Sequence, residues 1–327
     1  MKLLVDEKDR RILFELDKNS RAPISKVAKA CHLPKHVVRY RIAELERKGI
    51  ILQYYAVADL TCLGYLNFRE AWKFADAPPS VLKEISSYLS KSPKLWWAAR
   101  VSPFYDIVCA GWARDVNDAY DFLKGFHARF GIRIKQESTA FYTYFKHFPK
   151  RYLYPGQHAW GKVPTIGGKT VMKYDEKDIL ILSTLSQDAR ASIQAIARVS
   201  GLSETAARQR IKRLEKEGAI IAYRLLLDYE KLGLLYFWAH CRFRNFASMD
   251  RVEAAICENP AVVYTDRAVG EMGLGIDFVY SSQRELEAYL SSLQSMFPSD
   301  IREIEYVTVL ENLKVLYTPS ELGKRNG

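Results

Sequence analysis

The sequence lacks the features that would place the protein in a membrane or in an oxidising compartment. None of its apolar runs approaches the roughly 20 residues that a transmembrane helix needs. The segment MKLLVDEKDRR at the N-terminus has acids where a signal peptide has an apolar core. The five cysteines are odd in number and include no C-x-x-C pair, which argues against a disulfide framework or a zinc site. We therefore expect a cytoplasmic protein with reduced thiols, no membrane association, no metal and no cofactor.

Acidic residues are scarce in two segments of the chain. Overall, 49 Lys and Arg face 38 Asp and Glu, a formal net charge of +11. Residues 1–60 hold 13 basic and 8 acidic side chains, and residues 146–174 hold six basic side chains and no acid. By contrast, residues 175–233 hold ten basic and nine acidic side chains. The excess charge suggests a polyanionic partner that meets the N-terminal part and the middle of the chain.

One stretch of the sequence is written twice. VVRYRIAELERKGII at 37–51 corresponds to AARQRIKRLEKEGAI at 206–220, an offset of 206 − 37 = 169. At this offset residues 6–64 align without a gap on residues 175–233, with 23 identities over 59 positions. The two copies are homologous, so the chain consists of one module used twice.

Each copy predicts three short helices. In the first copy Ile12, Leu13 and Leu16 share one face of the first helix, and Pro23 opens the second. The third helix begins at Pro34 in the first copy and is capped by Ser203 in the second. Gly49 and Gly218 end it in the left-handed conformation, and an apolar strand follows at 50–57 and 219–227. A three-residue break between the second and third helices is typical of a helix-turn-helix.

The third helix carries the candidate DNA-binding residues. In the first copy Val38, Ile42 and Leu45 form its inward stripe. The residues predicted to face DNA are Lys35, His36, Arg39, Tyr40 and Arg47, with Arg41 flanking, and Thr205, Arg208, Gln209 and Lys212 in the second copy. Arg can bridge guanine and Gln can bridge adenine in the major groove, whereas the alternative is a merely solvated helix face. Because the second copy has Glu204 where the first has Lys35, we expect the second unit to bind DNA more weakly.

The remainder of each module predicts the same order of strands and helices. The first reads as strand 65–74, helix 80–89, strands 95–101 and 105–112, helix 116–130 and strand 132–145. The second reads as strand 234–246, helix 249–258, strands 261–269 and 272–280, helix 283–297 and strand 301–316. The order βαββαβ is that of a ferredoxin-like domain. The expected fold is α+β, with two helix-turn-helix domains, each followed by a ferredoxin-like domain.

These patterns set the expected domain boundaries. They are a helix-turn-helix at 1–60, a ferredoxin-like domain at 61–150, a basic linker at 151–173, a second helix-turn-helix at 174–232 and a second ferredoxin-like domain at 233–327. The linker contains two Pro, four Gly and three Lys between Tyr152 and Lys173. It either lies near DNA phosphates or is a solvated tether.

Both copies resemble the Lrp/AsnC family of transcription regulators. The family motif matches the first copy at Asp6, Asp9, Ile12, Leu13, Leu16, Arg21, Arg41, Ile42, Leu45, Glu46, Gly49, Ile51, Tyr54, Asp59, Leu63 and Gly64. The same motif matches the second copy from Asp175 and Asp178 through Arg210, Tyr223 and Asp228 to Gly233. Over the βαββαβ halves the resemblance rests on element order alone. Tandem forms of this kind resemble archaeal rather than bacterial members.

The resemblance implies a DNA-binding regulator with an effector-binding ferredoxin-like domain. Family members bind small effectors, often amino acids, near a turn that resembles G-x-Y-D. The corresponding positions here are Ser102, Tyr105 and Asp106 in the first copy, and Gly270, Met272 and Gly273 in the second. The first turn keeps Tyr-Asp and the second keeps Gly, so neither is complete. The alternative is a structural hairpin turn.

Two other functions compete with sequence-specific regulation. Siroheme decarboxylases resemble the same family, and their acid–base chemistry would need His or Arg grouped in a cleft. The six histidines of this chain, two of them in the first helix-turn-helix, show no local cluster, which disfavours an enzyme. A non-specific architectural protein would bind any duplex with a steep salt dependence.

Duplication within one chain has a geometric consequence. Two recognition helices reach successive major grooves only when they are about 34 Å apart, which single-copy regulators achieve by dimerising. We expect the two ferredoxin-like sheets to pack on each other as an intramolecular pseudo-dimer, with further homodimerisation left open. The two halves could then diverge to read an asymmetric double-stranded DNA site.

Overall fold

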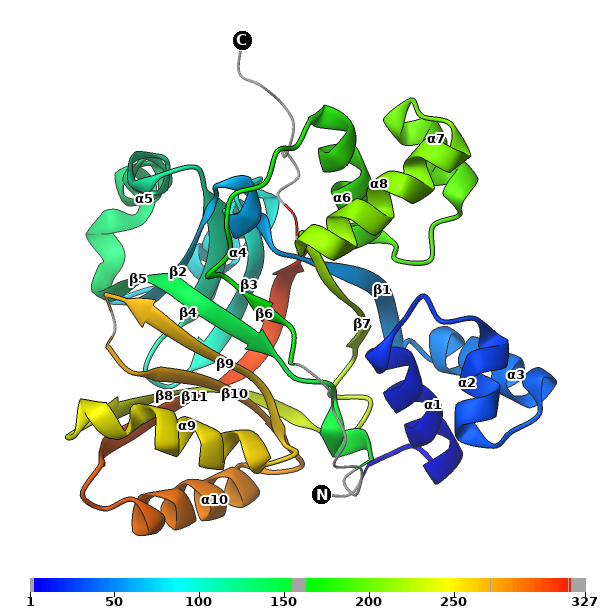
Figure 1. Ribbon diagram of the computed structural model, residues 1–327. Coiled ribbons are helices and arrows are strands. Elements are labelled where there is room, and N and C mark those ends of the chain that lie inside the picture. The colour runs from blue at the N-terminus through cyan, green and yellow to red at the C-terminus, as the bar shows by residue number, and fades with distance from the viewer. Residues whose placement is uncertain (1–2, 155–162, 271, 317, 319–327) are drawn as a thin grey trace.

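The computed structural model describes residues 3–154, 163–270, 272–316 and 318, and it contains two modules of the same plan (Figure 1). The first comprises α1 (Glu7–Lys18), α2 (Ile24–Cys31), α3 (Lys35–Arg47), β1 (Ile51–Ala58), β2 (Leu66–Phe74), α4 (Pro79–Lys91), β3 (Leu95–Ser102), β4 (Ile107–Ala113), α5 (Val116–Phe130) and β5 (Ile134–His147). The second comprises α6 (Glu176–Gln187), α7 (Ile193–Ser200), α8 (Glu204–Glu217), β7 (Ile220–Leu227), β8 (Leu235–Phe243), α9 (Met249–Glu258), β9 (Val262–Val269), β10 (Leu274–Tyr280), α10 (Gln283–Met296) and β11 (Ile301–Val315). The predicted element order is therefore confirmed in both modules. The middle of the basic linker, 155–162, lies outside the described residues, and the short strand β6 (Thr165–Ile166) follows it.

Local sequence accounts for the ends of the short helices. The Asp6 carboxylate caps α1 by accepting a hydrogen bond from Asp9 N at 2.8 Å, and Ser203 caps α8 in the same way from Ala206 N at 3.2 Å. Gly49 and Gly218 have φ of 65° and 83°, as predicted for left-handed helix ends. Pro34 differs slightly from expectation, because it is the residue before the helix and Lys35 is the first helical residue.

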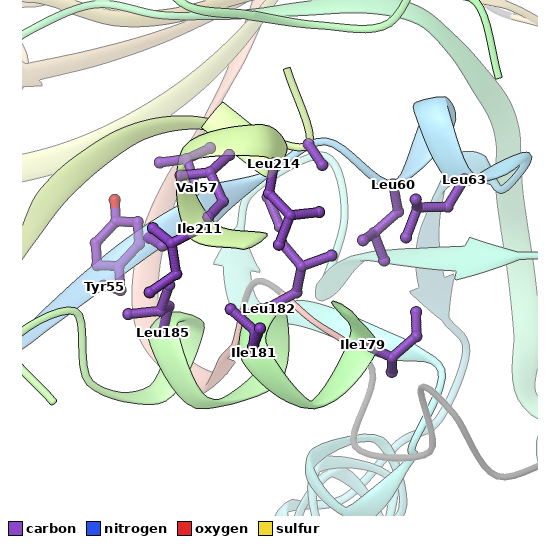
Figure 2. Packing of buried hydrophobic residues seen from close by; sticks show 14 of the residues in the cluster. Tyr55, Val57, Leu60, Leu63, Ile179, Ile181, Leu182, Leu185, Ile211 and Leu214 are labelled. Carbon is purple, nitrogen blue, oxygen red and sulfur yellow. The ribbon is translucent and has the colours of Figure 1, made fainter. Parts of the chain in front are cut away.

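The three-helix units are packed crosswise on a ribbon built by both modules. Strands β1 and β7 pair antiparallel, with Tyr55 opposite Arg224. Helix α6 of the second module packs on β1 of the first, and Leu182 and Leu185 lie in the same buried cluster as Tyr55 and Val57 (Figure 2). Helix α1 of the first module packs on β7 of the second. Each helix-turn-helix thus buries apolar surface against a strand of the other module.

Two arginine–tyrosine contacts repeat this exchange with pseudo-twofold symmetry. The guanidinium of Arg190 lies 3.9 Å from the ring centroid of Tyr54, and that of Arg21 lies 5.5 Å from the ring centroid of Tyr223. Each arginine also donates to a backbone carbonyl of the other copy, Arg190 to Ser20 and Arg21 to Ala189. These four motif residues therefore hold the two copies together.

The two βαββαβ units form one closed eight-stranded ring. The strand order is β5-β2-β4-β3 in the first sheet and β9-β10-β8-β11 in the second, as in ferredoxin-like domains. Strand β5 pairs with β9 at one edge, and β3 pairs with β11 at the other. The expected pairing of the two sheets is present within one chain, and it uses the hydrogen-bonding edges as well as the facing surfaces. Joining both edges leaves neither sheet with an open side.

Helices cover the outside of the ring. Helices α4 and α5 lie over the first sheet, where Trp72 stacks on Phe126 with ring centroids 4.1 Å apart, and α9 and α10 lie over the second (Figure 1). The inner faces meet through a smaller apolar cluster that includes Ala71, Ala99 and Trp238. All five cysteines are free thiols, and no helix among the described residues is both long and apolar enough to cross a bilayer.

A fully buried carboxylate joins three distant parts of the chain. Asp17 on α1 accepts hydrogen bonds from Lys150 Nζ at 3.0 Å and from Leu225 N at 3.2 Å, and it lies 3.4 Å from the Arg224 guanidinium. Burial alone would raise the pKa of Asp17, but the two cations outweigh it and hold the pKa below its ordinary value. The charged form of Asp17 is therefore the one that stabilises the fold.

Replacing Asp17 by Asn should lower the free energy of unfolding by about 3–5 kcal/mol at pH 7, because two buried cations lose their counter-charge. The folded pKa of Asp17 is depressed, so its stabilisation is present above the unfolded pKa of about 3.9 and is lost as the pH falls through the folded pKa. Urea unfolding followed by tryptophan fluorescence at pH 7 and pH 3 measures both effects. The matched control is Ser186→Ala at the equivalent buried position, whose hydroxyl bonds the Ala56 carbonyl and which should show no such pH dependence. An undiminished difference between wild type and Asp17→Asn at pH 3 would contradict this account.

Candidate nucleic-acid interface

Helix α3 presents the predicted basic face to solvent. Its inward residues Val38, Ile42 and Leu45 are at most 4% exposed, and this buried stripe determines which side of the helix faces solvent. The side chains of Lys35, His36, Arg39, Tyr40 and Arg47 are all exposed, with Tyr40 at 67%. An exposed tyrosine of this size next to an arginine is suited to a phosphate or a base edge.

Helix α8 presents the equivalent face of the second module. Ala207, Ile211 and Leu214 are buried. The predicted residues on its outer side are all exposed: Thr205, Arg208, Gln209 and Lys212. Arg208 lies 3.6 Å from the carboxylate of Glu204, one helical turn earlier. Part of its charge is therefore compensated within the helix.

Arg41 has a different position from the one expected. Its guanidinium donates to Asp6 at 2.7 Å and to Asp9 at 2.8 Å, both on or next to α1, and the side chain is 24% exposed. In the second copy Arg210 binds Asp175 at 2.6 Å and Asp178 at 3.0 Å in the same way. Although burial by itself raises the pKa of Asp6, the hydrogen bonds from backbone N–H groups and from Arg41 lower it. Arg41 therefore ties the recognition helix to α1 and does not extend the exposed face.

Arg47 is exposed but paired along its own helix. Its guanidinium donates to both oxygens of Glu44, at 3.1 and 2.8 Å. This contact holds the pKa of Glu44 below its ordinary value. Within α2 and α3 the strongest candidates for DNA contact are thus Lys35, Arg39 and Tyr40.

The two interfaces differ in charge as the sequence predicts. Residues 24–48 contain seven Lys and Arg against two Glu, a net of 7 − 2 = +5, and the equivalent residues 193–217 contain six against three, a net of 6 − 3 = +3. Of the second set, Arg210 and Arg213 are both bound to Asp178. The first face therefore offers more uncompensated positive charge to a phosphate backbone.

The first predicted effector turn is occupied by structural contacts. Tyr105 is 7% exposed, and its ring lies 6.4 Å from that of Trp238. The Asp106 carboxylate accepts from Lys73 Nζ at 2.7 Å and from Phe74 N at 2.8 Å. Ser102 is at the end of β3, opposite Thr308 of β11. These three residues connect strands in the described structure.

The second predicted turn is also tightly packed. Gly270 has φ of 105°, and a Cβ there would lie 2.4 Å from the Thr139 carbonyl oxygen. A Cβ at Gly273 would lie 2.6 Å from the Cys241 carbonyl oxygen. Met272 is 62% exposed, and Glu271, the remaining residue of this turn, lies outside the described residues. Both glycines are thus required because the backbone of another strand approaches closely. This observation favours the alternative of a structural hairpin turn.

A cavity between the two sheets contains residues that the sequence patterns did not single out. It has a volume of about 60 Å³ and is lined by Arg69, Trp96, Trp97, Val108, Tyr142, Phe145, Leu226, Tyr229, Tyr236, Trp238, Tyr264, Asp277, Asn312 and Val315. The available signal was Asp277, the one charged residue in the otherwise apolar strand β10 (Leu274–Tyr280). Among the described residues, no group of three or more His, Cys, Asp or Glu side chains is arranged to hold a metal ion.

Comparison with known proteins agrees with the assignment of the two three-helix units. The family model for winged helix-turn-helix DNA-binding domains matches residues 5–51 and 174–221. Both three-helix units are helix-turn-helix domains. In these domains α3 and α8 are the third helices, which are the ones whose basic faces are exposed.

Two regulators show the extent of the sequence similarity. The HTH-type transcriptional regulator LrpA of Pyrococcus abyssi is 48% identical over 59 residues, which are 18% of this chain and 42% of that protein. The glutamate uptake regulatory protein of Zymomonas mobilis is 27% identical over 158 residues, 47% of this chain and 96% of that protein. The similarity thus includes both archaeal and bacterial regulators, so it does not confirm the expected archaeal source.

The chain also resembles solved structures over almost its whole length. The crystal structure of the siroheme decarboxylase NirDL matches with a TM-score of 0.65 over 97% of this chain and 96% of that chain, at 14% sequence identity. At this identity the likeness concerns the fold. It agrees with the arrangement of two helix-turn-helix domains and two ferredoxin-like domains in one chain.

The different positions of Arg41 and Arg39 generate a prediction. Arg41→Ala should lower the free energy of unfolding by about 1 kcal/mol, because a half-buried guanidinium with two carboxylate partners is lost. Arg39→Ala should leave stability unchanged and weaken DNA binding, which a fluorescence-anisotropy titration measures beside a urea melt. If Arg41→Ala kept full stability and lost DNA affinity as Arg39→Ala does, Arg41 would belong to the interface after all.

Proposed function

We propose that the chain is a sequence-specific regulator of transcription of the Lrp/AsnC type. It is a cytoplasmic protein whose two modules bind double-stranded DNA. The observation that carries the proposal is the exposed basic face of α3 within a matched helix-turn-helix domain. The inward stripe and the clamp to α1 give that face a fixed orientation. The proposal assigns no catalytic activity to the chain.

The crosswise packing supports a pseudo-dimer that acts as one reader of DNA. The two helix-turn-helix domains lie on the same side of the eight-stranded ring, and the paired strands β1 and β7 lie between them (Figure 1). Both recognition helices are thereby attached to one two-stranded ribbon, as a homodimer would attach them to its interface. Because α3 and α8 carry different outward residues, the favoured site is an asymmetric one.

The two recognition helices should contribute unequally. Arg39→Ala should weaken binding to a cognate duplex by roughly 10- to 100-fold, the usual effect of losing a base-contacting arginine. Arg208→Ala should cost less, because Arg208 is already paired with Glu204 and the second face has less net charge. Fluorescence anisotropy at one fixed salt concentration measures both, and Arg302→Ala, which replaces an exposed arginine on β11, is the matched control. Equal losses for Arg39→Ala and Arg208→Ala would contradict the proposed asymmetry.

Sequence-specific regulation and non-specific packaging make different predictions for competition. A selection of bound genomic fragments followed by footprinting should give a protected region longer than one helical turn. Random DNA at the same salt should compete poorly for the selected site, whereas an architectural protein would bind both alike. Protection of less than one turn would rule out simultaneous engagement of both helices.

A siroheme decarboxylase-like activity is the second candidate, and one observation favours it: the fold likeness to NirDL extends over 97% of the chain. The described histidines give it little support, since His147 and His240 are buried and His127 is at the surface beside Glu137. Titration with an iron-containing tetrapyrrole tests this candidate. A new absorbance band that saturates at one equivalent would favour it over regulation.

A further inference from the structure

The cavity between the two sheets combines aromatic walls with a carboxyl group that has no cation. Asp277 on β10 is 6% exposed and lines the cavity. Its carboxylate accepts a hydrogen bond from the Tyr236 hydroxyl at 2.6 Å. Within the described part of the chain, no Lys, Arg or His lies within ion-pair distance of it. Without a counter-ion, burial favours the neutral form of this carboxyl group, whereas a cation placed beside it would favour the ionised form.

Strand register places aromatic rings on both sides of Asp277. Trp238 on β8 and Tyr264 on β9 are its cross-strand partners, and residues directly opposite in antiparallel strands share one face of the sheet. Trp238, Asp277 and Tyr264 therefore form one row that faces the cavity. The opposite wall contains Trp96, Tyr142 and Phe145.

The neighbouring arginine does not neutralise Asp277. Arg69 on β2 is paired with Asp266 at 3.2 Å, and both side chains are at most 3% exposed. Its guanidinium lies 4.5 Å from the ring centroid of Trp238 and 5.4 Å from that of Tyr142. One guanidinium thus faces two carboxyl groups, Asp266 and Asp277. Burial, and to a smaller extent the charge of Asp266, raise the pKa of Asp277 to about 8, although the hydrogen bond from Tyr236 and the charge of Arg69 act to lower it. The carboxyl group is therefore mostly protonated near pH 7, and a cation bound beside it would favour its charged form.

We propose that this cavity binds a small organic ammonium ion, with its charged head against Asp277 and its carbon atoms against the aromatic walls. Aromatic faces attract soft organic cations, whereas hard metal ions need several oxygen ligands. One water molecule needs roughly 10–15 Å³ of the volume that is open to the centre of a water-sized sphere. The cavity has about 60 Å³ of this volume, so it accommodates several water molecules or an ammonium head with a short chain. The exposed residue Asn312 marks the side on which the cavity meets solvent.

The site rejects an anion and favours a cation without a carboxylate. The Arg69 guanidinium is already engaged by Asp266 and covered by two rings, so a carboxylate ligand would have to displace a buried ion pair. A zwitterionic amino acid is disfavoured for the same reason. Binding at this site needs no DNA, so it stands or falls independently of the proposed function.

Isothermal titration of the full chain with n-butylammonium chloride in 0.15 M NaCl tests the site, with 1-butanol as the neutral isostere and butyrate as the anion. The ammonium should bind at one site at least 10-fold more tightly than the alcohol, and butyrate should not bind. Tryptophan fluorescence should change in parallel, because Trp96 and Trp238 line the cavity. Equal affinity for the ammonium and the alcohol would reduce the site to an apolar cavity and overturn the proposal, as would tighter binding of butyrate or of a zwitterion.

Asp277→Asn supplies the decisive variant, because the amide has the same shape and can keep the hydrogen bond from Tyr236. It should abolish the preference for the ammonium while leaving the weak binding of the alcohol unchanged. Retention of alcohol binding shows that the variant is folded. Tyr264→Leu, which removes one ring of the row, should weaken ammonium binding by roughly 2- to 5-fold. Undiminished ammonium binding by Asp277→Asn would contradict the assignment.

Discussion

The antiparallel pairing of β1 with β7 is the interaction on which the rest of this structure depends. Both three-helix units pack on these strands, since α6 packs on β1 and α1 packs on β7. Arg21 and Arg190 reinforce the exchange through Tyr223 and Tyr54 of the opposite copy. Neither helix-turn-helix can therefore bury its apolar side without the other module. The orientation of the recognition helices is a property of the whole chain.

The repeated sequence motif is chiefly an architectural one. Arg41 and Arg210 bind the acids at the start of α1 and α6, and Tyr54 and Tyr223 donate to Glu46 and Glu215 at 2.5 and 2.6 Å. The shared residues thus set the shape of the unit. Residues that differ between the copies, such as Lys35 and Glu204, occupy the exposed ends of the recognition helices. These differences change the surface that each recognition helix exposes, and buried positions differ as well, as Asp17 and Ser186 show.

Much of this fold could be predicted from local patterns. Helix α5 at 116–130 and helix α9 at 249–258 have the predicted bounds, because their apolar residues recur at helical spacing. Helix α5 also has a capping residue, Asp115, at its start. The outward positions of Arg39, Tyr40 and Gln209 followed from the same periodicity. Pairing between β5 and β9 could not be predicted, since it depends on the meeting of two edges more than a hundred residues apart. The ion pairs of Arg41 with Asp6 and Asp9 were missed because periodicity places a side chain on a face and does not identify its partner.

Closure of the eight-stranded ring has a consequence for the history of such a chain. A single module with this strand order has two open sheet edges, and it could complete such a ring only with a second copy that is complementary to itself. Once both halves are fused, β5 has only to fit β9, and β3 has only to fit β11. Each half is then free to lose the ability to pair with itself, and loss of either half would leave two bare strand edges open to aggregation. The duplication, once diverged, is therefore hard to reverse.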